Sequence, residues 1–488
     1  MFKNIMFLCI MFHMQFLNRK LELTYLKKIG ESQGAAFVVI YGRRRIGKTR
    51  LLLEWLNQSQ GLYWVADESS ANLQRRYFSL ALEQHLSGFS QIEYPDWSIF
   101  FERLAKEANQ ANWRGPLVID EFPYLVATSP ELPSILQRFI DHEAKKAKLI
   151  VAICGSDQRL IQGLILNANE PLYGRAQAII KLEPLHPYYL QFALKLKTAK
   201  ECVKTYSIWG GIPRYWELAA ALEGSLNESI ESLVLNPQGI LHEEPMRLLL
   251  EELPPAITLR PILDAIGFGM HKLSEIAGRL NVPSTSLSRP LERLRDLGYV
   301  EKEIPFGALE KNSKRTLYKI KDPFLRFWFD VVAPRRSALS QTTKKNRILW
   351  LEKSFPFVIA QTWEELCRQA IPYLSDIWGG IPFEPARRFW HGAGPEWDIV
   401  AESFDKKILL LGEVKWKDEI PSVKFLEKTA QELISKGSPS LHSNFANIYY
   451  VIFVPEKPKN KKILSNNIFI VDASDVIILA GKAALENE

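Results

Sequence analysis

One stretch, GRRRIGKT at residues 42–49, constrains the fold of this chain more than any other feature of its sequence. It follows an apolar, β-branched run at residues 37–40 and precedes the amphipathic run LLLEWL. The spacing is that of GxxxxGK[ST], in which backbone N–H groups between a strand and a helix surround phosphate oxygens. The sequence therefore predicts an α/β domain with a parallel sheet and a phosphate-binding loop, the P-loop NTPase fold.

The residue types in this loop predict individual roles. Lys48 is expected to reach the β and γ phosphates of a nucleotide, and Thr49 to ligate Mg²⁺. ATP and Mg²⁺ are therefore the expected cofactors. The predicted nucleotide-binding residues in and beside the loop are Gly42, Arg43, Arg44, Arg45, Ile46, Gly47, Lys48, Thr49 and Arg50.

Two further apolar runs end in polar residues that fit the same chemistry. LVIDE ends in Asp120, predicted to hold Mg²⁺ through water, and Glu121, predicted to polarise the attacking water. LIVAICGS ends in Ser156, which is predicted to sense the γ-phosphate. Arg175 in PLYGR is predicted to stabilise charge on the transferred phosphoryl group, with an ordinary surface arginine as the alternative.

Several segments together resemble the archaeal-type P-loop ATPases of the signal-transducing, AAA-related (STAND) clade. They are FLNRKLELTYLKKI, GRRRIGKT, VIDEFPYL, CGSDQ, PLYGR and WGGIPRYWEL, within residues 16 to about 235. The resemblance implies that Asn18, Arg19 and Glu22 lie near the base, and that the GxP motif ending in Pro213 bears on the adenine. IWGGIP occurs again at residues 377–382 with different flanks, so that copy is predicted to be only a turn.

Residues 270–320 have the pattern of a winged helix-turn-helix. A helix, a turn at NVP and a second helix are followed by a strand and a basic hairpin. The expected DNA contacts are Ser284, Thr285, Ser288 and Arg289 in the major groove and Lys311, Lys314 and Arg315 on phosphates. The alternative is a packing or hinge module that does not touch DNA.

WDIVAESFDKKILLLGEVKW, residues 397–416, predicts a β-hairpin with a charged cluster. Glu413 and Lys415 stand two apart in a strand and share a face, where Asp398 on the neighbouring strand meets them. The two carboxylates are expected to bind Mg²⁺, with the Val414 carbonyl as a further ligand. Lys415 is expected to position or deprotonate a water for phosphodiester attack.

A helix before this hairpin and a helix and strands after it give the order of a PD-(D/E)xK nuclease core, an α/β restriction-endonuclease-like domain. In the ATPases resembled above, a nuclease-like domain often follows the winged helix and ends its second strand in GExKW. The resemblance adds Glu364 in TWEEL as a further catalytic acid, with Glu365 as its competitor. A degenerate nuclease fold kept for DNA or protein docking is the alternative.

Length and composition complete the expectations. At roughly 150 residues per domain, 488 residues predict about three domains. After an amino-terminal extension (1–15), which is not expected to be part of the fold, they are a P-loop ATPase (16–235), a connector with a winged helix (236–335) and a nuclease-like domain (336–488). Four cysteines without metal-like spacing fit a reducing compartment, and the apolar start is short for a membrane span.

The predicted protein is a cytoplasmic ATP-hydrolysing switch, without membrane association, that couples nucleotide state to DNA binding and Mg²⁺-dependent DNA cleavage. DNA is the expected partner, since the net charge of +7 permits polyanion binding. The alternative is a STAND-type regulator with an inactive nuclease-like domain, acting through a protein partner or self-association.

Overall fold

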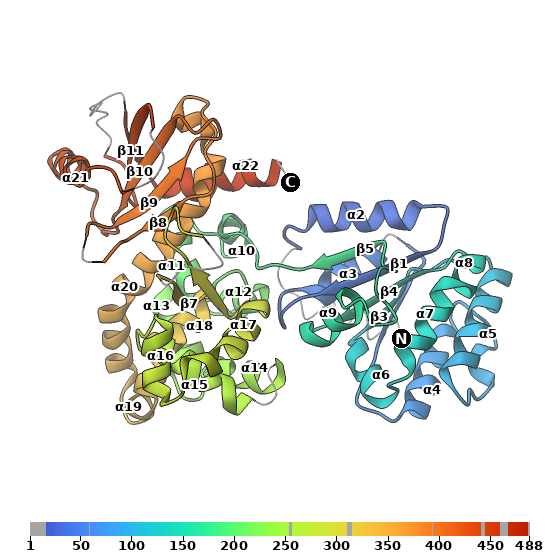
Figure 1. The fold of residues 1–488 in the computed structure, drawn as a ribbon. Coiled ribbons are helices and arrows are strands. Elements are labelled where there is room, and N and C mark those ends of the chain that lie inside the picture. The colour runs from blue at the N-terminus through green and yellow to red at the C-terminus, as the bar shows by residue number, and fades with distance from the viewer. Residues whose placement is uncertain are drawn as a thin grey trace. The chain divides into compact units, whose positions relative to one another are not determined.

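The computed structural model describes residues 16–57, 59–252, 256–309, 315–392, 394–440, 445–458 and 467–486. The chain forms two compact units (Figure 1). The phosphate-loop unit comprises Phe16–Pro184 with the short segment Ile212–Arg214. The carboxy-terminal unit contains Leu185–Gly211 and Tyr215–Glu488. The predicted extension at residues 1–15 lies outside the described residues.

A five-stranded parallel sheet, in the order β2-β3-β4-β1-β5, forms the centre of the phosphate-loop unit. Every residue of β1 and β4 is buried, as expected for strands that helices cover on both faces. The strands are β1 (Ala36–Tyr41), β2 (Leu62–Val65), β3 (Leu117–Asp120), β4 (Ile150–Gly155) and β5 (Ala178–Lys181). The predicted parallel α/β domain is confirmed.

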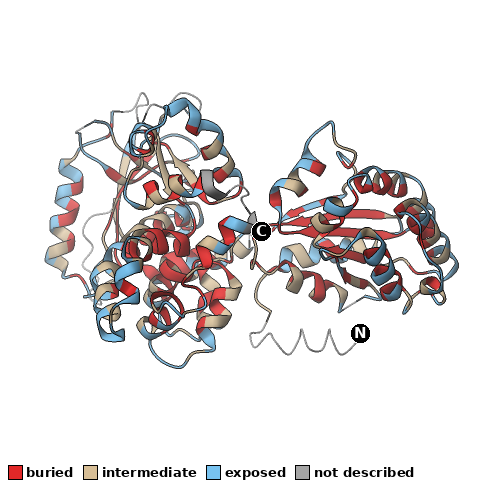
Figure 2. Cartoon of the chain, turned by 90° about the horizontal axis from the view of Figure 1, so that it is seen from below, coloured by how far each residue is buried: buried red, intermediate tan, exposed pale blue. Residues whose placement is uncertain are grey.

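The helices around this sheet bury aromatic side chains against it. Trp64 of β2 stacks on Phe78 with ring centroids 4.2 Å apart, and Phe100 packs beside Phe78. Figure 2 shows the strands buried and the outer helix faces exposed. The helices are α2 (Lys20–Glu31), α3 (Lys48–Leu56), α4 (Ala71–Leu82), α5 (Trp97–Gln110), α6 (Phe122–Thr128), α7 (Leu132–Asp141), α8 (Glu143–Ala147) and α9 (Gln158–Leu166).

The first part of the carboxy-terminal unit is helical. Within it, α15, α16 and α17 pack beside β6 (Val300–Glu303) and β7 (Leu317–Ile320), an antiparallel pair. The expected order of helix, turn, helix and hairpin is therefore present. The helices are α10 (Leu190–Ala193), α11 (Ala199–Trp209), α12 (Pro213–Ala220), α13 (Leu226–Ile230), α14 (Glu244–Glu252), α15 (Ala256–Gly267), α16 (Leu273–Leu280), α17 (Ser288–Asp296), α18 (Pro323–Phe327) and α19 (Arg336–Ser340).

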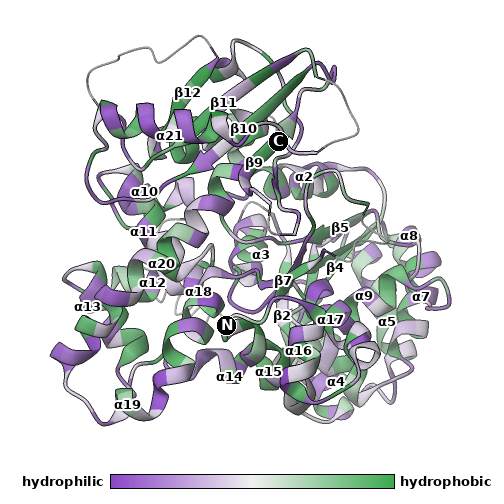
Figure 3. Ribbon diagram, turned by 60° about the vertical axis from the view of Figure 1, so that its left-hand side comes forward, coloured by the Kyte–Doolittle hydropathy of each residue, from purple (hydrophilic) through white to green (hydrophobic). Residues whose placement is uncertain are grey.

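A second five-stranded sheet, in the order β12-β11-β10-β9-β8, completes this unit. Strands β8, β9 and β10 are antiparallel neighbours, whereas β10, β11 and β12 run parallel. Figure 3 shows β10 and β11 as mostly hydrophobic. The elements are α20 (Lys344–Ala370), β8 (Arg387–Phe389), β9 (Trp397–Glu402), β10 (Ile408–Val414), α21 (Val423–Ser435), β11 (Asn447–Phe453), β12 (Ile468–Val471) and α22 (Ala480–Glu486).

Strands β9 and β10 are the predicted hairpin, and its centre is tightly packed. A Cβ atom on Gly412 would lie 2.7 Å from both Ile399 Cβ and Val451 Cγ1, so only glycine fits there without a shift. Trp416, just after β10, meets Trp363 of α20 edge to face at a centroid distance of 5.7 Å. The hairpin is thereby fixed against α20.

The first unit ends earlier than the predicted domain boundary at residue 235. From Leu185 on, the chain belongs mainly to the carboxy-terminal unit, in which α11 contacts α18 and α20. Trp209 stacks on Phe324 of α18, and Lys204 pairs with Asp418 at 2.6 Å. None of the helices in the described parts of the chain has both the length and the apolar character needed to cross a membrane.

Candidate functional sites

The phosphate loop begins where β1 ends, at the carboxyl edge of the parallel sheet. Gly42 and Gly47 have φ of 153° and 95°, values that favour glycine. A Cβ atom on Gly42 would also lie 2.8 Å from the Leu182 carbonyl oxygen. Helix α3 starts at Lys48, so the amino end of this helix points into the loop. Ile46 and Arg43 are buried; Arg44, Arg45 and Arg50 are half-buried.

The charged and hydroxyl side chains of the loop are already held in place. Lys48 Nζ donates to the carbonyl oxygens of Gly42 at 2.9 Å and Arg43 at 3.0 Å. Thr49 Oγ1 donates to Asp120 Oδ2 at 3.1 Å, which joins the two residues predicted to hold Mg²⁺. Their oxygen atoms are the donors that Mg²⁺ prefers, so the residues present fit this cation.

Tyr63 of β2 also bonds to Asp120, a contact that the sequence motifs did not indicate. Its hydroxyl donates to Asp120 Oδ2 at 2.6 Å. Burial and the Asp120 charge raise the pKa of the Tyr63 phenol, which therefore remains a donor at neutral pH. Cys154 of β4 is buried nearby, and burial raises the pKa of its thiol. The Asp120 carboxylate is thus held by Thr49 of α3, Tyr63 of β2 and the Glu121 N–H.

Glu121, the second acid of the predicted pair, lies on Ser156. Ser156 Oγ donates to both carboxylate oxygens of Glu121, at 3.2 and 3.0 Å. Glu121 itself has φ of 50°, an uncommon conformation for a residue other than glycine, at the start of α6. The structure therefore brings together the predicted water-polarising acid and the predicted γ-phosphate sensor.

Two motifs outside the loop also lie beside it. The buried guanidinium of Arg19 donates to the Ile46 carbonyl at 3.2 Å and to the Glu183 carbonyl at 2.7 Å, and pairs with Glu22 at 3.1 Å. Pro213 Cγ lies 3.8 Å from the position of a Cβ atom on Gly47, so the GxP segment adjoins the loop. The second copy is a turn as predicted, with positive φ at Gly379 and Gly380.

The structure does not bring Arg175 to the phosphate loop. Strand β5 is parallel to β1, with Val38 opposite Ala178, so residues just before β5 lie at the amino edge of the sheet. The phosphate loop leaves the opposite edge. Arg175 instead pairs with Asp141 at 3.0 Å. Arg175 therefore does not reach the transferred phosphoryl group of its own chain, contrary to the prediction. The motif alone did not indicate the direction of β5, on which the position of Arg175 depends.

The hairpin site in the carboxy-terminal unit contains the predicted residues close together. Lys415 Nζ donates to Glu413 Oε1 at 2.7 Å, and Asp398 Oδ2 accepts from the Val414 N–H at 2.9 Å. Burial, and then the charge of Glu413, raise the pKa of Asp398. Burial opposes the charge on Glu413, but hydrogen bonds from two lysines outweigh it and lower the pKa of this acid.

Lys436 is the second of these lysines, and sequence reasoning missed it. It follows α21, and its Nζ donates to Glu413 Oε2 at 2.6 Å and to the Glu396 carbonyl at 3.0 Å. Both oxygens of Glu413 are therefore engaged by ammonium groups. The two carboxylates fit a divalent cation chemically, yet among the described residues no three acids, histidines or cysteines converge as a metal cluster.

The adjacent acids of α20 have different partners. Glu364 lies 3.7 Å from Arg368, and burial, followed by the charge of Asp398, raises its pKa. Glu365 instead accepts from Arg326 Nη2 at 2.9 Å, and Arg326 also bonds to Thr362. Of the two competing acids, Glu364 is therefore the one beside the hairpin site.

The residues predicted to contact DNA are only partly described. Ser284, Thr285, Ser288 and Arg289 are exposed at and before the start of α17. Arg315 Nη1 donates to the Trp390 carbonyl at 3.3 Å. Lys311 and Lys314 lie outside the described residues.

Comparisons with known proteins agree with the prediction of a P-loop ATPase domain in the first part of the chain. Residues 16–218 match a family described as an ATPase domain predominantly from Archaea. The resemblance to archaeal-type P-loop ATPases is confirmed for these residues. Residues 328–433 match a family of archaeal and bacterial proteins of unknown function.

Individual relatives extend over more of the chain. An uncharacterized protein of Methanocaldococcus jannaschii is 29% identical over 407 residues, 83% of this chain and 88% of that protein. The Walker-type ATPase of Pyrococcus abyssi is similar at 20% identity and a TM-score of 0.47, over 64% of this chain and 96% of that one. A STAND protein of Pyrococcus horikoshii with a tetratricopeptide repeat sensor is 17% identical, with a TM-score of 0.32, over 73% and 50% of the two chains.

Proposed function

We propose that the phosphate-loop unit binds ATP with Mg²⁺ and hydrolyses it, and that nucleotide state controls how the carboxy-terminal unit engages DNA. The observation that carries the first part is the Thr49 to Asp120 hydrogen bond of 3.1 Å next to Lys48. It joins the hydroxyl of Thr49, just after the loop, to the acid at the end of β3, the pair that holds Mg²⁺ in P-loop ATPases. The match of residues 16–218 to an ATPase family supports the same proposal.

The surrounding residues would divide the chemistry of hydrolysis among them. Thr49 and, through water, Asp120 would hold Mg²⁺, which supplies positive charge to the phosphates. Lys48 would exchange its two backbone carbonyl partners for phosphate oxygens. Glu121 would orient the attacking water, and its bonds to Ser156 hold its carboxylate in a defined position until then. Arg19 would keep the loop in shape through the Ile46 carbonyl.

The first experiment separates nucleotide binding from hydrolysis. Lys48→Ala should weaken ATP binding on the order of 100-fold, because a charged donor to the phosphates is lost. Glu121→Gln should retain binding while turnover falls on the order of 100-fold, because the water loses its base. Calorimetry with ATP and a phosphate-release assay measure the two quantities. Lys145→Ala, an exposed lysine on α8, is the matched control. Unchanged turnover in both site variants would refute the site.

The DNA part of the proposal is supported by the exposed polar residues at the start of α17. If Arg289 contacts DNA, Arg289→Ala should weaken DNA binding and reduce the slope of log affinity against log salt by up to about one. Fluorescence anisotropy at several salt concentrations measures this, with the exposed Lys344→Ala as control. If affinity and slope equal those of the parent protein, α15 to β7 is a hinge, and the STAND-type protein-interaction regulator is favoured.

A nuclease activity is the second candidate, favoured by the convergence of Asp398, Glu413 and Lys415. Mg²⁺ or Mn²⁺ bound by the two acids would supply Lewis-acid charge at a phosphodiester, and Lys415 would donate to the reacting water or phosphate. Asp398→Ala or Lys415→Ala should abolish divalent-dependent cleavage of plasmid or branched DNA while ATP hydrolysis persists. Cleavage that survives either substitution would make the hairpin a docking scaffold.

A further inference from the structure

A cavity of about 390 Å³ lies within the carboxy-terminal unit, apart from the phosphate loop. Its walls come from the end of α15, from β7, from the middle of α20 and from Trp328–Val332, a π-helical turn. Single π-helical turns occur frequently at functional sites. The volume is within the range of about 300–1,000 Å³ that small-molecule pockets occupy. The cavity is therefore large enough for a small ligand.

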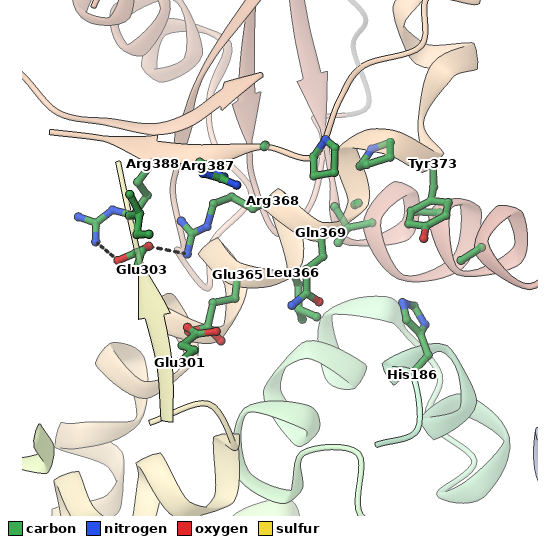
Figure 4. A pocket seen from close by; sticks show the side chains of 18 of the residues that line it. His186, Glu301, Glu303, Glu365, Leu366, Arg368, Gln369, Tyr373, Arg387 and Arg388 are labelled. Atoms are coloured by element: carbon green, nitrogen blue, oxygen red, sulfur yellow. Dashed lines mark hydrogen bonds and ion pairs between the residues drawn. The ribbon is translucent and has the colours of Figure 1, made fainter. Parts of the chain in front are cut away.

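A larger cavity, of about 610 Å³, shares Glu365 with this one. Figure 4 shows the larger cavity, in which Glu303 pairs with Arg388 at 3.4 Å and with Arg368 at 3.8 Å. Arg388 also pairs with Glu396 at 3.2 Å. These two arginines are therefore already neutralised by acids, and the larger cavity resembles the rest of the unit in this respect.

Asp330 makes the smaller cavity different. This acid stands in the π-helical turn and lines the cavity, and within the described residues its carboxyl has neither a hydrogen bond nor an ion pair. Burial raises its pKa to about 7, although the charge of Arg326 opposes the shift. A carboxylate that is largely removed from water without a partner is costly, and a cation placed against it would offset that cost.

The cavity wall contains three cations, and none of them bonds to Asp330. Arg326 is held by Glu365, to which its Nη2 donates at 2.9 Å. Lys319 pairs at 2.7 Å with an acid outside the cavity wall. Arg335 donates to a backbone carbonyl at 3.2 Å and is exposed, so water and salt screen its charge. Asp330 thus has no cation of its own.

The neutral polar groups of the wall can accept hydrogen bonds. His271 Nδ1 donates to the Tyr318 carbonyl at 3.0 Å, and burial lowers the pKa of the imidazole, so Nε2 carries a lone pair. Ser354 commits its proton to the Trp350 carbonyl at 3.1 Å. Gln361 Oε1 is buried and has no hydrogen bond within the described parts of the chain. An ammonium group, with three donors and no acceptor, suits such a lining.

Apolar side chains form the rest of the wall. Phe357 of α20 is 62% exposed. Phe268 is also partly exposed, but Arg279 lies over its ring at 5.7 Å from the centroid, so Phe357 is the ring that a ligand can cover. Ile266 and Val331 line the cavity from α15 and the π-helical turn. The cavity thus combines one acid, several acceptors and an apolar surface.

We propose that this cavity binds a small molecule with a primary ammonium group and an apolar group. The ammonium donates to the Asp330 carboxylate, and the apolar group covers Phe357. Because the walls come from α15, β7 and α20, the bound molecule connects these elements. The site depends on neither ATP hydrolysis nor DNA cleavage, so it stands or falls separately from the function proposed above.

The test is calorimetry on the full-length protein at pH 8 with 2-phenylethylamine and 2-phenylethanol, which differ only in their ammonium and hydroxyl groups. The amine should bind about tenfold or more tightly than the alcohol, because it makes a charged hydrogen bond. Asp330→Asn should remove this preference, and Phe357→Ala should weaken both compounds several-fold. Asp330→Asn removes a buried charge, and Phe357 is exposed, so both variants should fold. The exposed positions Asp376→Asn and Phe404→Ala are the matched controls.

The pH profile separates a ligand contact from a structural role. Asp330 must lose its proton to bind the ammonium, so affinity for the amine should rise about tenfold from pH 6 to pH 8 and stay flat in Asp330→Asn. Burial also raises the pKa of Glu364, which pairs with Arg368 at 3.7 Å. The charged and titratable groups of the wall besides Asp330 are His271, Lys319, Arg326, Arg335, Glu364 and Glu365.

Three results would overturn the proposal. The first is no binding of 2-phenylethylamine, and the second is equal affinity for the amine and the alcohol. The third is an affinity, or a rise with pH, that is the same in the parent protein and in Asp330→Asn. In that third case another acid of the wall, and not Asp330, would hold the amine.

Discussion

The two units hold their buried charges in opposite ways. At the phosphate loop, Lys48 bonds to backbone carbonyls, and Asp120 and Glu121 accept from hydroxyl groups and backbone N–H groups. In the carboxy-terminal unit, Glu413 is engaged by two lysines, and Arg326 is paired with Glu365. The first unit thus keeps its charges for a ligand, whereas the second neutralises Glu413 and Arg326 internally. A ligand of either residue must therefore displace an existing partner.

The largest expected effect contrasts one buried cation from each unit. Arg326→Met leaves Glu365, and the neighbouring Glu301 and Asp330, without their common cation, and should destabilise the carboxy-terminal unit by about 3–5 kcal/mol. Lys48→Met removes only hydrogen bonds to carbonyls and should change the stability of its unit by about 1 kcal/mol or less. Hydrogen exchange of α18 and α20, compared with β1 and β4, measures both. Equal losses of stability in the two units would contradict the predicted difference between Arg326 and Lys48.

A second test uses pH. Burial raises the pKa of Asp330 to about 7, although Arg326 opposes the shift. Because the folded state binds this proton more tightly than the unfolded state, the contribution of Asp330 to stability should be fully present below about pH 4 and be lost as pH rises through 7. Asp330→Asn should remove that fall and stabilise the unit at pH 8 by about 1–2 kcal/mol after allowance for partial exposure.

Urea unfolding at pH 5 and pH 8, followed by hydrogen exchange in the carboxy-terminal unit, checks this prediction. The exposed Asp376→Asn variant is the control. A parent protein and an Asp330→Asn variant with parallel pH profiles would contradict the assignment of the proton to Asp330.

The smallest effect concerns the exchange of partners at the hairpin. Because Lys436 engages Glu413 Oε2 at 2.6 Å, Lys436→Ala should free that oxygen and raise Mn²⁺ affinity about tenfold, or about 1.4 kcal/mol. Calorimetry with Mn²⁺ measures the change. Lys428→Ala, on α21 and paired with Glu432, is the control. An affinity that stays at the parental value would mean that Lys436 does not compete with a cation.

Sequence reasoning succeeded where the relevant residues are close in the chain. The strand, loop and helix around Lys48 follow from local pattern, and the meeting of Glu413 with Lys415 follows from strand periodicity. The position of Asp398 required only that two neighbouring runs form a hairpin. These predictions depend on short-range geometry, which is nearly independent of the rest of the fold.

Long-range partners were beyond that reasoning. Tyr63 reaches Asp120 because β2 and β3 are neighbours in the sheet, and Lys436 reaches Glu413 because α21 ends beside β10. Arg175 was misplaced because its edge of the sheet depends on the direction of β5. The choice between Glu364 and Glu365 depends on the rotation of α20 against its neighbours. Each of these requires the three-dimensional arrangement of elements far apart in sequence.

The packing of Gly412 and Trp416 changes how much the GEVKW segment says about chemistry. Gly412 is required by the side chains of Ile399 and Val451, and Trp416 by its contact with Trp363, whether or not any bond is cleaved. A protein that had lost catalysis would retain both. The informative letters of the motif are therefore Glu413 and Lys415 alone. A relative that keeps the glycine and tryptophan while losing the acid and lysine would have inherited the architecture without the reaction.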